Sequence, residues 1–64
     1  MKVNGKIILL QKDINLFDFL INNNYEISKI AVELNKKIIV KAEFKNIALN
    51  DSDSLEIVTF VGGG

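Results

Sequence analysis

The chain has no cysteine, histidine, tryptophan, proline or arginine. Without cysteine it forms no disulfide, and without cysteine and histidine the usual zinc sites are excluded. The same absences remove the commonest general base at neutral pH and the most reactive nucleophile. Eight lysines balance eight acidic residues, so the chain lacks the basic surface that binds nucleic-acid phosphates. The composition disfavours an autonomous enzyme and a nucleic-acid-binding protein, and favours a module that works through partner proteins.

Long apolar runs are also missing. The longest uninterrupted apolar stretch is the four residues Ile7–Leu10, far short of the roughly 20 that a membrane-spanning helix needs. The first five residues contain a turn and no apolar region of the kind that signal peptides carry. We therefore expect a cytoplasmic protein with no membrane partner. A length of 64 residues predicts one small domain, which we expect to be a monomer on its own.

An Asn4-Gly5 pair near the start is typical of a two-residue β-hairpin turn, because both central residues of a type I′ turn need positive φ. We expect strands over residues 1–3 and 6–10 on either side of it. Directly opposite residues of a hairpin share one face of the sheet. The residues predicted to face the core are Met1, Val3, Ile8 and Leu10, and those predicted to face away are Ile7 and Leu9.

A short helix is expected after the hairpin. Asn15 is suited to the N-cap, and Asp18 in the first turn complements the helix dipole. Apolar residues recur at helical spacing from Leu16 to Leu20, and asparagines at 22–24 end the pattern. So short a helix is not stable alone in water, so it needs a sheet to pack on.

Two strand patterns follow, over residues 30–34 and 37–40, with a turn at Asn35-Lys36 between them. Residues 42–46 are ambiguous, and one interpretation is a helical turn that places Phe44 inward. A helix packed across one face of a mixed sheet is the economical arrangement for this order of elements. We expect an α+β domain of the β-grasp, or ubiquitin-like, type, in which the last strand is central and parallel to the first.

That last strand has the clearest pattern, because residues 55–61 are rich in β-branched and aromatic side chains. We place Leu55 and Ile57 toward the core, and Val58 and Phe60 away from it. The opposite register, with Phe60 in the core, is the open alternative. In our preferred register the outward residues form an apolar docking patch for partner proteins. The residues predicted for this patch are Val58, Phe60, Ile7 and Leu9.

Six short segments keep the order and spacing of a known family and together span essentially the whole chain. They are Val3-Asn4-Gly5, Ala31–Asn35, Ile39-Val40, Asp51–Asp53, Leu55–Val58 and Gly62–Gly64. In this combination the chain resembles the ThiS family of ubiquitin-like sulfur carrier proteins of thiamine biosynthesis, within the wider ThiS and MoaD group. The resemblance implies a β-grasp domain over residues 1–61 and a flexible reactive tail over residues 62–64.

The resemblance also implies a mechanism. A separate ATP-using enzyme of the ThiF type adenylates the carboxylate of Gly64, and a cysteine desulfurase or rhodanese type of donor supplies the sulfur. The resulting thiocarboxylate then donates sulfur to thiazole synthase. The carrier itself binds no cofactor, because the partner enzyme consumes the ATP. Gly62 and Gly63 form the rest of the tail, and residues without a Cβ suit close approach to another protein's backbone.

Two alternatives remain open at this point. The chain could be a sulfur carrier of the molybdopterin synthase small-subunit type, which shares the fold and the diglycine end. It could also be a noncovalent ubiquitin-like adaptor whose outer sheet face binds a partner and whose glycine tail is inert. Asp51 and Asp53 are interpreted as turn-forming residues, because too few further oxygen ligands accompany them for a metal site.

Overall fold

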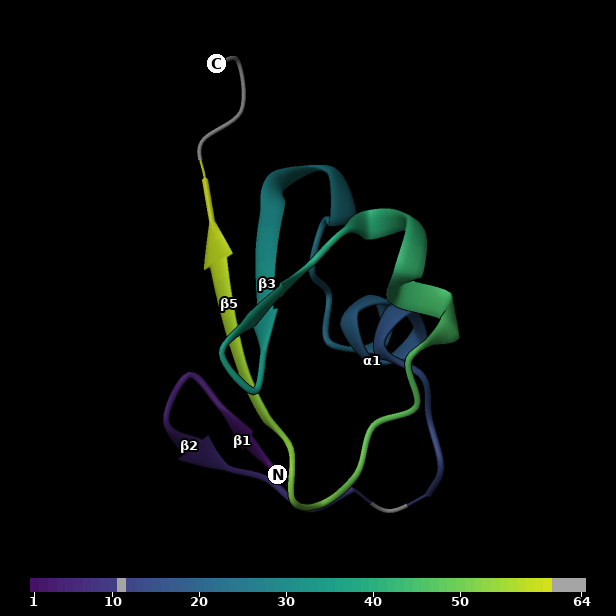
Figure 1. Cartoon of the computed structure of the whole chain (residues 1–64), viewed down its shortest axis with the longest axis vertical. Coiled ribbons are helices and arrows are strands. Elements are labelled where there is room, and N and C mark those ends of the chain that lie inside the picture. Colours follow the sequence, from purple (N-terminus) through teal and green to yellow (C-terminus); the bar gives the residue numbers. More distant parts are fainter. Residues whose placement is uncertain (11, 61–64) are drawn as a thin grey trace.

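The computed structural model describes residues 1–10 and 12–60 and shows one mixed sheet with the main helix on one face (Figure 1). The elements are β1 (Lys2–Val3), β2 (Lys6–Ile7), α1 (Leu16–Asn22), β3 (Ile30–Leu34), β4 (Lys37–Ile39) and β5 (Ser54–Thr59), with 3₁₀ helices at Ile27–Lys29 and Lys41–Asn46. The strand order is β2-β1-β5-β3-β4. β1 and β5 are parallel, and the other neighbours are antiparallel. The predicted arrangement, with the last strand central and parallel to the first, is confirmed.

The first hairpin has the predicted turn but a shorter second strand. Asn4 and Gly5 both have positive φ, at 52° and 84°, as a type I′ turn requires. β2 ends at Ile7 rather than at residue 10. Beyond it the chain turns toward the loop before β5, where the Leu10 N–H donates to an Asp51 carboxylate oxygen at 3.2 Å. The hairpin bonds continue as far as Ile8, whose N–H donates to the Met1 carbonyl at 2.8 Å, and residues 9 and 10 lie beyond the part of the chain with which they could pair.

α1 begins and ends where its asparagines predict. The Asp18 N–H donates to the Asn15 side-chain oxygen at 2.7 Å, which confirms Asn15 as the N-cap. At the other end the Asn23 side chain donates to the Phe19 carbonyl at 2.8 Å. Leu16, Phe19 and Leu20 are buried, so the apolar stripe faces the sheet as expected.

A compact set of apolar side chains fills the space between α1 and the sheet. The buried ones are Met1, Leu16, Phe19, Leu20, Ile30, Val32, Phe44, Leu49, Leu55 and Ile57. Phe44 is 1% exposed and comes from the 3₁₀ helix Lys41–Asn46, so residues 42–46 do form the helical turn that the sequence left ambiguous. The inward positions predicted for the first hairpin are confirmed, because Met1 is buried and Val3, Ile8 and Leu10 pack against the core.

The register of β5 decides which side chains reach the surface. Leu55 and Ile57 are buried in the core. Val58 and Phe60 point away from it, with 61% and 45% of their surfaces exposed. The preferred register is therefore confirmed, and the alternative that buries Phe60 is wrong. Within residues 1–10 and 12–60, no helix is long and apolar enough to cross a lipid bilayer.

Candidate functional site

β5 carries the chain toward its carboxyl terminus. It ends at Thr59, five residues before Gly64. In Figure 1 its carboxyl end lies at the opposite end of the sheet from the β1–β2 hairpin. The predicted tail residues Gly62, Gly63 and Gly64, and with them the predicted boundary after residue 61, lie outside the described residues. The described structure therefore shows the surface around the end of β5, the last strand before these residues in the sequence.

That surface has apolar side chains on the outer face of the sheet. Ala31 pairs with Val58, and Val40 directly follows Ile39, which pairs with Val32. Continuing this ladder by one residue places Val40 beside Ala31, because antiparallel partners shift in step. Val40 is 63% exposed. A row of outward apolar residues, Val40, Ala31 and Val58, therefore runs from just after β4 across β3 to β5 at one level.

Phe60 extends this row toward the terminus. Its N–H donates to the Lys29 carbonyl at 2.9 Å, and the Lys41 ammonium nitrogen lies 5.9 Å from the centre of its ring. That distance is within the range of a cation–π contact. We call Val40, Val58 and Phe60 the carboxyl-end patch. The Lys41 ammonium group therefore lies at the border of this apolar patch, whereas the Lys29 ammonium group pairs with Glu26 at 3.3 Å.

The other two predicted docking residues do not join this patch. Ile7 and Leu9 are 75% and 81% exposed, and Ile7 lies on the outer face as predicted. However, Ile7 pairs with Lys2, which pairs with Ser54. Ser54 precedes Val58 by four residues of β5, which is about 13 Å along a strand. The predicted docking residues therefore form two separate groups at opposite ends of the sheet.

Charged side chains occupy the surface between those two groups. Glu33 lies directly opposite Glu56, and both are exposed. Ile38, opposite Glu33 on β4, is 77% exposed. Sequence reasoning missed Val40 and Ile38 as outer-face residues, although the alternation along residues 37–40 carried the signal. Which of these residues share a patch depends on how β3 pairs with both β4 and β5.

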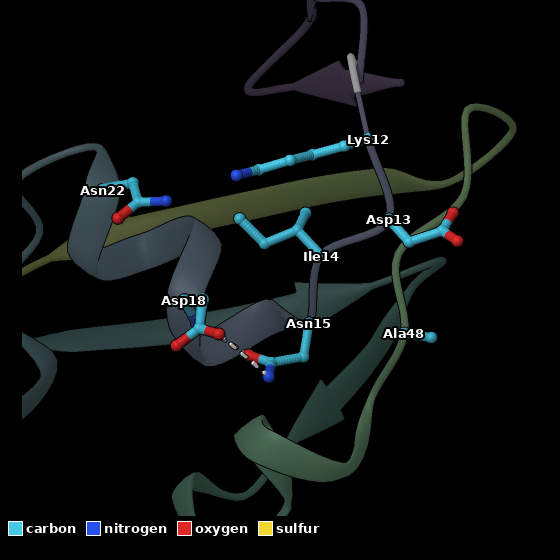
Figure 2. Close-up of a pocket in the computed structure, with 7 residues that line it drawn as sticks. All are labelled: Lys12, Asp13, Ile14, Asn15, Asp18, Asn22 and Ala48. Carbon is cyan, nitrogen blue, oxygen red and sulfur yellow. Dashed lines mark hydrogen bonds between the residues drawn. The ribbon is translucent and has the colours of Figure 1, made fainter.

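A shallow groove near the start of α1 is the second candidate site (Figure 2). Its lining residues are Lys12, Asp13, Ile14, Asn15, Asp18, Asn22 and Ala48. The Asn15 side-chain amide donates to an Asp18 carboxylate oxygen at 3.2 Å, and Lys12 points across the groove toward Asn22 in Figure 2. The Asn15 and Asp18 polar groups therefore serve to cap the helix. The lining residues include no serine, threonine, cysteine or histidine.

The acidic residues before β5 hold a turn, as predicted. Asp53 accepts the Asn50 N–H at 2.8 Å and the Asn35 side-chain amide at 2.9 Å. The Asn35 side-chain oxygen in turn accepts the Ser54 N–H at 2.9 Å. These bonds join the β3–β4 turn to the start of β5. Within the part of the chain that the structure describes, no three potential histidine, cysteine or carboxylate ligands come together.

Comparison with known proteins identifies the family. The chain matches the ThiS family model over residues 1–64. It is 40% identical over 65 aligned positions to the sulfur carrier protein ThiS of Bacillus subtilis strain 168, and the alignment covers 100% of this chain and 98% of that protein. It is also 38% identical to the uncharacterized protein ycf40 of Pyropia yezoensis, over 100% of this chain and 90% of that protein.

Two further similarities concern a longer protein and a solved structure. Thirty-six positions, 56% of this chain, are 53% identical to part of a thiazole synthase from Paramagnetospirillum magneticum, and the match covers 11% of that protein. The crystal structure of the thiamine biosynthesis protein ThiS from Geobacter metallireducens superposes with a TM-score of 0.80 at 27% identity, covering 98% of this chain and 96% of that one. The chain therefore belongs to the ThiS family of sulfur carrier proteins and has their β-grasp fold.

Proposed function

We propose that this chain carries sulfur as a thiocarboxylate on Gly64 and donates it for the thiazole ring of thiamine. The observation that carries the proposal is the full-length match, at 40% identity, to a sulfur carrier protein. The exposed carboxyl-end patch supports it, because a carrier needs a surface on which partner enzymes can dock. The terminal carboxylate is the reactive group, and the β-grasp domain is the part that partner enzymes recognise.

The chemistry starts from a carboxylate that does not react on its own, because an anionic carboxylate is a poor acyl donor. In the proposed first step a carboxylate oxygen of Gly64 attacks the α-phosphorus of ATP on the adenylating enzyme, and pyrophosphate leaves. The outer sulfur of a persulfide on a donor of the cysteine desulfurase or rhodanese type then attacks the carbonyl carbon and AMP leaves. A thiol of a partner protein attacks the resulting acyl disulfide, forms a disulfide with the donor cysteine and releases the thiocarboxylate. None of these steps needs a histidine, a cysteine or a metal ion from the carrier.

The distance between domain and terminus limits where a partner must dock. Gly64 is the fifth residue after Thr59, and these five residues span at most about 17 Å when fully extended. An active site that holds Gly64 must therefore lie within that distance of the end of β5. The carboxyl-end patch borders this point, whereas Ile7 lies about 13 Å further back along the sheet. We propose the carboxyl-end patch as the docking surface for the adenylating enzyme.

Thiazole synthase is the proposed sulfur acceptor. A thiazole synthase from Paramagnetospirillum magneticum shares 53% identity with 36 positions of this chain. A segment similar to the carrier within such an enzyme supports the proposal that carriers of this kind bind thiazole synthase. This observation favours the thiamine branch over a role with molybdopterin synthase.

The proposal is tested by mixing the full-length chain with ATP and the adenylating enzyme of its source and measuring pyrophosphate. We expect release that depends on the chain and saturates with its concentration. Val58→Ser should raise the KM for the chain about tenfold, because it removes an apolar anchor from the centre of the proposed interface. Pyrophosphate release that is the same with and without the chain would favour a noncovalent adaptor.

Ile7→Ser is the matched control, because it makes the same kind of change at another exposed site on the same face. We expect it to leave the KM within about twofold of wild type, as single exposed substitutions outside an interface usually do. If Ile7→Ser raised the KM as much as Val58→Ser, the docking surface would extend over the whole outer face.

A further inference from the structure

β5 has a neighbour along its whole length on one side only. β3 pairs with it from Leu55 to Thr59. β1 has two residues, Lys2 and Val3, and these pair with Ser54 and Leu55. Figure 1 shows no strand on the β1 side of the upper part of β5. Within the described residues, the carboxyl-terminal half of β5 therefore has an open edge.

Asn4 occupies the first position on that edge. Its side-chain oxygen accepts the Ile57 N–H at 2.7 Å, and its side-chain amide donates to the Ile57 carbonyl at 3.2 Å. These two bonds replace those that a longer β1 would make. The φ of 52° at Asn4 turns the main chain away from β5 at this point. Pairing with β1 therefore ends at Leu55, the Asn4 side chain bonds to Ile57, and Thr59 is the next residue whose backbone groups face this edge.

The alternation of the β3–β5 ladder fixes the direction of the Thr59 backbone. The Phe60 N–H donates to the Lys29 carbonyl at 2.9 Å, and the Asn35 N–H donates to the Ser54 carbonyl at 2.8 Å. Even-numbered residues of β5 therefore bond to β3, because bonded pairs alternate in an antiparallel ladder. Thr59 lies opposite Ile30 in a non-bonded pair. Its N–H and carbonyl consequently point toward the open edge, where an added strand could bond to both.

We propose that an extended segment of the adenylating enzyme pairs with this open edge and hydrogen-bonds to the N–H and carbonyl of Thr59. The inference rests on the proposed function, because that function puts Gly64 in the enzyme's active site. The enzyme that binds Gly64 must lie close to this edge, because only five residues follow Thr59 in the chain. Strand addition provides main-chain hydrogen bonds whatever the side chains of the added segment. The added strand would therefore fix the direction in which the chain leaves β5 toward the active site.

A groove on the core side of the sheet lies next to the same edge. Its apolar lining includes Val3, Ile8, Phe19 and Tyr25, and Asn4 belongs to its wall. Side chains of an added strand alternate between the two faces of the sheet. Those on the core side would meet this groove, and those on the outer side would meet the carboxyl-end patch. The added segment is therefore expected to carry apolar residues on both faces.

Amide hydrogen exchange of the full-length chain tests the pairing directly. We expect the Thr59 amide to exchange at least about tenfold more slowly when the adenylating enzyme is bound, as for a newly formed sheet hydrogen bond. The Phe60 amide should change less, because it already donates to Lys29 in the free chain. An unchanged Thr59 amide in an enzyme-bound chain would overturn the inference and leave the proposed function standing.

Two other outcomes of that experiment also have definite meanings. If the Thr59 amide slowed with increasing concentration of the chain alone and adding the enzyme slowed it no further, a second copy would occupy the edge and the inference would be wrong. If the enzyme neither bound nor adenylated the wild-type chain, the proposed function would fail and the inference with it. Pyrophosphate release, measured in parallel, separates this failure from the others.

Thr59→Pro provides an independent test, because proline removes the N–H and is tolerated where that group faces solvent at a sheet edge. We expect the Kd for the enzyme to rise about three- to tenfold, the usual contribution of one backbone hydrogen bond. Thr59→Val keeps the N–H and should bind within about twofold of wild type. Equal Kd values for the proline and valine variants would contradict the proposed bond.

Ile38→Pro is the control for a proline in the sheet. Ile38 lies opposite Glu33, and Glu33 lies opposite the even-numbered Glu56, so the backbone groups of Glu33 bond to β5. The N–H of Ile38 therefore points away from β3, toward the solvent at the β4 edge of the sheet. We expect this variant to bind the enzyme as wild type does. A similar rise in Kd for both proline variants would show a general effect on the domain, and the edge inference would fail.

Discussion

Deletion of Gly64 is expected to lower the rate of adenylation by at least about 100-fold, because a shift of about 1 Å in a reacting group already has an effect of this size. The shortened chain still ends in a glycine carboxylate, but the carboxylate lies about 3.3 Å closer to the domain. An active site that fits the full tail would not bring it to the α-phosphorus of ATP. The rate of pyrophosphate release with the source's own adenylating enzyme measures the effect.

Two comparisons distinguish a tail that is too short to reach the active site from a domain that no longer folds. The buried core lies between Met1 and Ile57, so the deletion should change the free energy of unfolding by less than about 0.5 kcal/mol. Gly64→Ala keeps the length and the carboxylate but adds a Cβ, and we expect a smaller loss of rate than for the deletion. A truncated chain that folds normally and is still adenylated at the wild-type rate would contradict the role of Gly64.

Phe44→Ala is expected to reduce the free energy of unfolding by about 3–5 kcal/mol, the usual cost of removing a buried phenylalanine ring. Phe44 is 1% exposed and anchors the 3₁₀ helix Lys41–Asn46 over the core. A domain of 64 residues has a total stability of about 3–10 kcal/mol. The substitution should therefore remove a large fraction of the total stability and lower the urea midpoint. Urea unfolding followed by circular dichroism measures it.

Phe60→Ala is the matched control, because it removes the same side chain from the surface. Phe60 is 45% exposed, so we expect the free energy of unfolding to fall by no more than about 1 kcal/mol. The two variants together test whether residues 42–46 belong to the core. Equal urea midpoints for the two variants would contradict the structure's assignment of Phe44 to the core and Phe60 to the surface.

Features set by local sequence were predicted well. Asn4-Gly5 has the backbone geometry that a type I′ turn demands, and Asn15 caps α1 through its side chain. The outward position of Val58 follows from simple alternation along one strand, and its exposure agrees. In each case neighbouring residues contain the deciding information. The central position of β5 was also predicted correctly, but as a choice of fold, because the periodicity of the sequence does not determine the neighbours in a sheet.

Features set by pairing between distant strands were predicted less well. The single docking patch assumed that Ile7 lies beside Val58, but the register through Lys2 places Ile7 level with Ser54. Alternation along residues 37–40 indicates that Val40 faces outward, but its place beside Ala31 becomes apparent only when β3 and β4 are aligned. The bonds from Asn4 to Ile57 join residues 53 positions apart. Local patterns do not contain these registers, because they depend on which residues meet after the chain has folded.

The most direct test of the central claim is the intact mass of this protein isolated from its native cells, with fragmentation to locate any change. The claim predicts a population in which sulfur replaces one oxygen of the carboxylate of Gly64. Because thiocarboxylates hydrolyse, the same measurement is repeated after incubation with the source's adenylating enzyme, ATP and sulfur donor. A terminus that remains an ordinary carboxylate in both samples would contradict the sulfur-carrier account and favour a noncovalent adaptor.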